Sequence, residues 1–181
     1  MDFTALFIVS VLIFFVFFHF KNTFLNVKYI RSQVDNRLYL VRNVEDKQKA
    51  ADTLAKMSKK LEQLINHLVN NKPTDDKKRS EAINRLKKNY NPDNISESTE
   101  FSKYTSYSVN KGEKIIFCIR SKDNNKIEKF NILMFVAIHE LGHLMSESIG
   151  HTEEFWDNFK YLLVEAVKIN IYKKDDFNKI P

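Results

Sequence analysis

The sequence has 181 residues, 43% of them hydrophobic and 29% charged, with a formal net charge of +6 at pH 7. These values are ordinary for one globular domain with an appendage, and only three glycines and three prolines argue against a loop-rich all-β fold. The basic balance permits binding to nucleic acid, but no arginine stripe or recognised nucleic-acid-binding signature is present, so nucleic acid is not an expected partner. Cys118 is the only cysteine, which excludes a disulfide within the chain and a cysteine-based zinc site.

The first expected element is an apolar helix. Residues 3–20 contain no charged residue and consist almost wholly of Leu, Ile, Val, Phe and Ala. As a helix this stretch spans about 27 Å, close to the hydrocarbon thickness of a bilayer. The sequence therefore predicts an uncleaved single-pass membrane anchor over residues 1–22, since a signal peptide would begin with basic residues and end with small ones. Positive charge follows the stretch from Lys21 onward. Because basic residues flank membrane spans mainly on the cytosolic side, the rest of the chain is expected on that side of a cellular membrane, or in a virion membrane.

Residues 23–100 are expected to form a juxtamembrane segment followed by a helical region. The loose alternation of apolar residues over residues 27–43 is typical of a short strand pair or an extended segment. Over residues 44–70, apolar residues recur at the spacing of an amphipathic helix: Leu54, Met57, Leu61, Leu64 and Leu68. This stripe suits packing against the rest of the chain, and a helix of a partner protein is the alternative. A second short helix is predicted over residues 74–88.

Residues 101–181 are expected to be the catalytic domain. Two β-prone runs within residues 104–120 are joined by a turn that contains Gly112, which predicts a β-hairpin. Helices are predicted over residues 129–148 and 152–172. The expected fold class is therefore α+β, with a transmembrane helix, a helical middle region and a small domain that combines the hairpin with an active-site helix.

The chemistry is concentrated in the sequence His139-Glu140-Leu141-Gly142-His143. On a helix, side chains four residues apart lie on one face, so His139 and His143 are able to bind one metal ion. Neutral imidazoles suit Zn²⁺, which keeps one position for water in catalytic sites. Glu140 lies beside that face, where it is able to accept a proton as a general base. The pattern predicts hydrolysis of peptide bonds that depends on zinc.

A catalytic zinc ion needs a third protein ligand, and His151 is the best candidate. Gly150 permits the chain to turn back toward the metal just before it. Glu165, on the following predicted helix, is the rival ligand, and Glu154 is a weaker one. The group that stabilises the oxyanion stays open among three tyrosines, chosen by residue type alone: Tyr107, Tyr161 and Tyr172.

The motif at residues 139–143, followed by Gly-His-Thr-Glu-Glu-Phe-Trp at residues 150–156, resembles the WLM and SprT-like metallopeptidases. The resemblance covers residues 104–172 and implies a zincin-like domain in which Glu140 is the catalytic acid and base. It also implies three zinc ligands: His139, His143 and His151. Members of these families include proteases that clear protein crosslinked to DNA, from which this chain departs by its expected anchor and by having no recognisable DNA-binding tail. The pattern is also similar to metallopeptidases predicted for large DNA viruses.

These features predict a membrane-anchored zinc metallopeptidase with a protein or peptide substrate. The alternative is a non-catalytic, membrane-tethered structural protein, for instance of a virion, in which zinc only stabilises the fold. Glu140 favours catalysis, because a structural zinc site has no use for a general base. A third hypothesis, action on nucleoprotein, predicts DNA binding that weakens steeply with salt.

Overall fold

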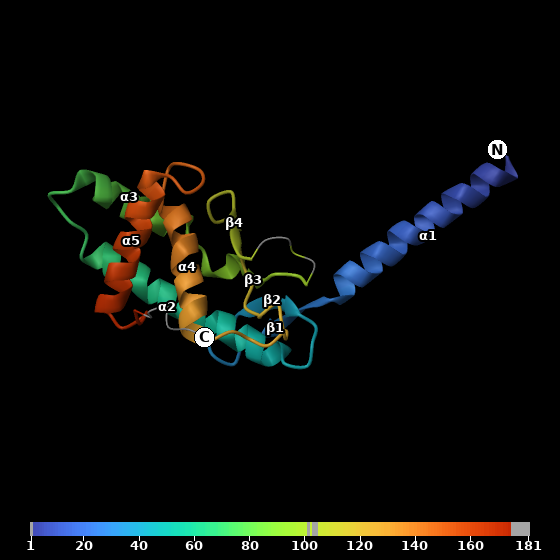
Figure 1. Ribbon diagram of the computed structural model, residues 1–181, viewed down its shortest axis with the longest axis horizontal. Coiled ribbons are helices and arrows are strands. Elements are labelled where there is room, and N and C mark those ends of the chain that lie inside the picture. The colour runs from blue at the N-terminus through green and yellow to red at the C-terminus, as the bar shows by residue number, and fades with distance from the viewer. Residues whose placement is uncertain (1, 101, 103–104, 175–181) are drawn as a thin grey trace.

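The computed structural model describes residues 2–100, 102 and 105–174 (Figure 1), and the side chains of all of these except residues 19–25. In this part of the chain, five α-helices and one five-stranded sheet form an α+β fold. The expected fold class is confirmed at this level.

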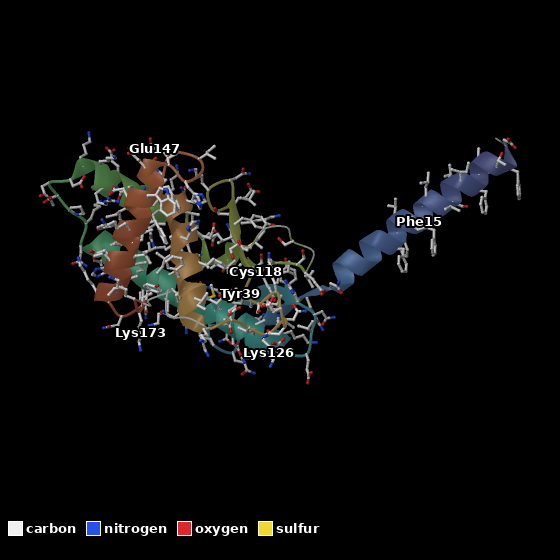
Figure 2. The ribbon with its side chains drawn as sticks, viewed as in Figure 1. Phe15, Tyr39, Cys118, Lys126, Glu147 and Lys173 are labelled. Atoms are coloured by element: carbon white, nitrogen blue, oxygen red, sulfur yellow. The ribbon has the colours of Figure 1, made fainter. Side chains whose placement is uncertain are left out.

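The first helix, α1 (Phe3–Leu25), extends away from the rest of the molecule (Figure 1). Its large apolar side chains are exposed, and Phe15, with 64% of its surface accessible, contacts no other element (Figure 2). The predicted membrane anchor is wrong, because the described residues contain no helix that is both long and apolar enough to cross a membrane. The predicted location, a single-pass membrane protein with its domain on the cytosolic side, depended on this anchor and is therefore not supported either.

The five strands form one mixed sheet in the order β1-β2-β3-β5-β4. β1 (Val27–Arg31) and β2 (Leu38–Arg42) are antiparallel neighbours. β3 (Ile95–Glu97) runs parallel to β2 on one side and to β5 (Lys114–Phe117) on the other. β4 (Tyr107–Val109) pairs with β5 in the antiparallel sense and forms one edge of the sheet. Both the strand pair predicted near the N-terminus and the predicted hairpin are therefore present.

The turn between β4 and β5 adopts left-handed backbone conformations at Asn110, Lys111 and Gly112, with φ of 45°, 57° and 112°. A Cβ atom at Gly112 would lie 2.2 Å from the carbonyl oxygen of Asn89, so only glycine fits there. This close approach seats the hairpin turn against the C-terminal end of the helix that ends at Asn89.

Four helices complete this body: α2 (Lys47–Asn70), α3 (Lys77–Asn89), α4 (Phe130–Met145) and α5 (Glu153–Lys168). α2 and α4 contact the sheet, whereas α3 and α5 pack mainly against these two helices. The apolar stripe of α2 is buried in the chain's own core: Leu54, Met57, Leu61, Leu64 and Leu68. The chain itself thus covers this stripe, as the packing alternative predicts.

One hydrophobic core contains residues from both sides of residue 100, such as Tyr39 and Val41 on one side and Ile115 and Ile138 on the other. Tyr39 lies well inside this body in Figure 2 and is 1% exposed. Both the core and the sheet therefore cross residue 100, where the sequence predicts a domain boundary.

Candidate metal centre

The histidine motif lies on α4, a helix that is buried over most of its surface. Apolar residues such as Leu133, Ala137 and Leu141 are almost fully buried, because a helix that is apolar nearly all round lies in a core. His139 and His143 are half-buried on the side that lines a cleft. Their ring centres lie 5.0 Å apart, as the spacing of four residues predicts.

His151 joins these two histidines from the loop between α4 and α5. Its Nε2 lies 3.0 Å from Nε2 of His139, and its ring centre lies 4.9 Å from those of both His139 and His143. One ring nitrogen of each histidine falls within 4.8 Å of the other two. The structure thus brings together the three residues predicted as metal ligands, and the cluster is compatible with a zinc site.

Glu140 lies next to the cluster with only 4% of its surface exposed. The hydroxyl and backbone N–H of Ser108, on β4, donate hydrogen bonds to its carboxylate. Among the described residues, Oε2 of Glu140 has no hydrogen-bond partner, although a buried carboxylate oxygen ordinarily has one. Burial raises the pKa of Glu140 to about 7, and the hydrogen bonds from Ser108 act against this rise. An unbonded carboxylate oxygen beside three convergent imidazoles fits a metal centre with a proton acceptor.

The imidazoles of α4 are held in their neutral form. Burial, followed by the charge of His151, lowers the pKa of His139. Burial lowers the pKa of His143 to about 4, with smaller contributions from His139, His151 and Lys111. Neutral imidazole is the form that binds a metal ion, so both side chains are ready to bind one at neutral pH.

An aromatic wall from α5 supports the three imidazoles. The ring of Phe155 stacks on His143 at 4.3 Å with an interplanar angle of 26°, and Phe159 lies 5.2 Å from His139. Gly142 permits this approach, because a Cβ atom there would lie 2.9 Å from the Phe155 ring. Packing against α5 therefore restricts the rotation of the His139 and His143 imidazole rings.

The histidines and Glu140 line a cleft of about 680 Å³. One wall is formed by residues 105–108 and the hairpin turn, and the opposite wall by α4 and residues 148–151. β4, the edge strand of the sheet, thus runs beside the candidate metal centre.

The two carboxylates considered as rival ligands lie outside the histidine cluster. Glu165 is bound to His67 of α2 at 3.0 Å and to Lys168. The carboxylate of Glu154 accepts hydrogen bonds from the backbone N–H groups of Glu147 and Ser148. Both therefore have structural partners of their own.

The three candidate tyrosines are separated in the structure. Tyr107 lines the cleft. Tyr161 carries the guanidinium of Arg79 over its ring at 4.3 Å, and Tyr172 is 5% exposed, with its ring 5.9 Å from Phe135. Of the three, Tyr107 is the one beside the histidines.

The sequence interpretation missed two residues of the cleft, Ser108 and Lys111. Ser108 contacts Glu140, and the ammonium of Lys111 contacts backbone carbonyls at the end of α4. Their partners lie 32 to 37 residues away along the chain, beyond the range of local spacing patterns. The position of both residues in a hairpin just upstream of the motif was the available signal.

No protein-family model matches the chain. The chain is 35% identical over 169 residues to an uncharacterized protein of Acanthamoeba polyphaga mimivirus, covering 92% of this chain and 84% of that protein. A second relative, an uncharacterized protein of Invertebrate iridescent virus 6, is 35% identical over 69 residues, which covers 37% of this chain and 38% of that protein.

A solved structure of similar fold is that of a Wss1 mutant from Saccharomyces cerevisiae, with a TM-score of 0.53. The likeness covers 73% of this chain and 91% of that chain at 14% sequence identity, so it concerns the fold alone. The chain therefore has a Wss1-like fold and belongs to the same family as the mimivirus protein.

Proposed function

We propose that this protein is a zinc-dependent peptidase in which His139, His143 and His151 hold the ion. The observation that carries the proposal is the convergence of three imidazole nitrogens within 4.8 Å, next to a buried carboxylate with an unbonded oxygen. The resemblance of the motif to WLM and SprT-like metallopeptidases supports it, and the Wss1-like fold agrees with it.

A zinc ion held by His139, His143 and His151 would supply a Lewis acid and would lower the pKa of a bound water to about 7. Glu140 performs the proton transfer: Oε2 accepts the proton of the attacking water and later delivers it to the leaving amine. Ser108 donates hydrogen bonds to the carboxylate, and Oε2 has no partner among the described residues. A pKa of about 7 for Glu140 suits a group that takes up and releases a proton near neutral pH.

The cleft lies beside the edge strand β4, where an extended peptide is able to bind. An edge strand offers backbone groups to a second chain, and peptides in extended form bind to such edges. β4 supplies that edge beside the histidines. Phe135, Val136 and Ile149 also line the cleft, so apolar side chains in the substrate are favoured over charged ones.

A zinc site with a purely structural role is less well supported. Structural zinc sites are closed by four protein ligands, whereas the cluster in the described part of the chain contains three. A buried Glu140 carboxylate without a partner for Oε2 also costs stability that a structural site has no reason to retain.

Cleavage of a fluorogenic peptide library by the full-length protein tests the proposal, with Glu140→Gln as the test variant. Glu81→Gln is the matched control, because it removes a carboxylate from α3 that is 59% exposed. Glu140→Gln is expected to keep its zinc and to lose about 10²- to 10⁴-fold in kcat, while Glu81→Gln keeps full activity. Undiminished cleavage by Glu140→Gln contradicts the proposal.

A further inference from the structure

The side chain of Lys111 joins the two walls of the cleft. It belongs to the turn between β4 and β5, and its Nζ donates hydrogen bonds to the carbonyl oxygens of Ser146 at 2.8 Å and Ser148 at 2.6 Å. A longer contact of 3.5 Å reaches the carbonyl oxygen of His143. The ammonium therefore binds the end of α4 and the start of the loop that carries His151.

The loop needs such support because little of its tip is buried. His151 is exposed, and Ile149 is 89% exposed. A Cβ atom at Gly150, where φ is +83°, would meet nothing within 4 Å. The His151 ring contacts the rings of Phe155 and Trp156, but residues 149–151 are exposed, so hydrogen bonds to the preceding loop residues also define their position.

Ser148, three residues before His151, is held from two directions. Glu154 accepts hydrogen bonds from its backbone N–H at 2.9 Å and from its hydroxyl at 2.7 Å. Lys111 donates to its carbonyl oxygen from the other side. The contact with Glu154 stays between the loop and α5, whereas the contact with Lys111 ties the loop to the sheet.

We propose that Lys111 is a positioning residue for His151. This proposal rests on the proposed zinc site. By holding Ser148, the ammonium determines where the His151 imidazole stands relative to His139 and His143. Metal ligands depend on such outer contacts, whose loss weakens metal affinity by about 10- to 100-fold. The lysine itself contacts only backbone carbonyls, so its effect on the metal passes through the loop.

A merely structural role is the competing explanation, because a lysine near a helix C-terminus also stabilises that helix. A double-mutant cycle separates the two. The zinc dissociation constant of the full-length protein is measured by competition with a chromophoric chelator, in a mild detergent that covers the exposed apolar side chains of α1. Lys111→Met is compared in the wild-type and His151→Ala backgrounds. Lys114→Met is the control, since it removes an exposed lysine from β5 of the same hairpin.

We expect Lys111→Met to weaken zinc binding by about tenfold and Lys114→Met to leave it unchanged. In the His151→Ala background, Lys111→Met is expected to have no further effect. An equal loss in both backgrounds overturns the proposal, and so does unchanged affinity when His151→Ala itself weakens binding. If the wild type binds no zinc, the proposed function fails as well. If Lys111→Met does not fold, Lys111→Arg replaces it, with a smaller loss that must also vanish in the His151→Ala background.

Discussion

Oε2 of Glu165 lies 3.0 Å from Nε2 of His67, so this carboxylate links α5 to α2. Its side chain is 12% exposed, and its other oxygen accepts a hydrogen bond from Lys168. Burial acts to raise the pKa of Glu165, but the hydrogen bonds from Lys168 and His67 outweigh it and hold the pKa low.

Glu165→Gln is therefore expected to lower the free energy of unfolding by about 2 kcal/mol, as the loss of hydrogen bonds to a charged group does, and to leave zinc content unchanged. Denaturant unfolding and metal analysis of the same preparation measure both. Loss of zinc with unchanged stability would instead make Glu165 a ligand.

A second prediction concerns the pH dependence of stability through Glu154. Burial acts to raise its pKa, but hydrogen bonds from Glu147 and Ser148 overcome this and lower the pKa to about 2. Because the pKa in the folded state lies below the ordinary value of 4.5, the contribution of Glu154 is complete above that value and is lost as pH falls toward 2. Wild type and Glu154→Gln should differ by about 2 kcal/mol at neutral pH, and the difference should shrink below pH 4.5. A difference that does not change with pH contradicts this explanation.

Gly142→Ala tests the packing of the aromatic wall. The new methyl group would lie 2.9 Å from the Phe155 ring, and that ring stacks on His143. Overpacking costs about 1–3 kcal/mol, partly offset by up to about 1 kcal/mol of better helix propensity. We expect a net loss of stability together with weaker zinc binding, measured by thermal unfolding and chelator competition. A stabilised variant with unchanged zinc affinity would contradict this prediction, because it would show that the Phe155 ring moves aside without loss of stability.

Ser108→Ala tests the contact that holds Glu140. The Ser108 hydroxyl lowers the pKa of Glu140, so its removal raises that pKa further. A general base has to be deprotonated to act, so the acidic limb of the pH profile of kcat/KM should move to higher pH. Activity at pH 6 should fall several-fold while activity above pH 8 changes little. An unmoved acidic limb would show that Ser108 does not act on the base.

The parts of the fold that depend on neighbours in sequence could be predicted from the sequence. The hairpin of residues 104–120 follows from two β-prone runs and a turn, and β4 and β5 confirm it. The closeness of His139 and His143 follows from helix geometry alone. Gly150 permits a left-handed turn just before His151, and its φ of +83° confirms that use.

Other features depend on contacts between distant residues and could not be predicted in this way. The parallel pairing of Leu40 with Ser96 and the bonds of Lys111 to Ser146 have no local pattern. The anchor prediction for residues 3–20 relied on apolar composition and on helix length, and it is wrong because the described residues contain no helix that is long and apolar enough to cross a membrane.

The central claim is that the three histidines hold one zinc ion, and metal content tests it most directly. Zinc per chain is measured by mass spectrometry after dialysis, for the wild type and for the His139→Ala variant. We predict about one zinc ion per wild-type chain, as a site with three imidazole ligands holds, and near-complete loss in the variant. A wild-type protein without zinc, or a variant that retains it fully, would contradict the claim.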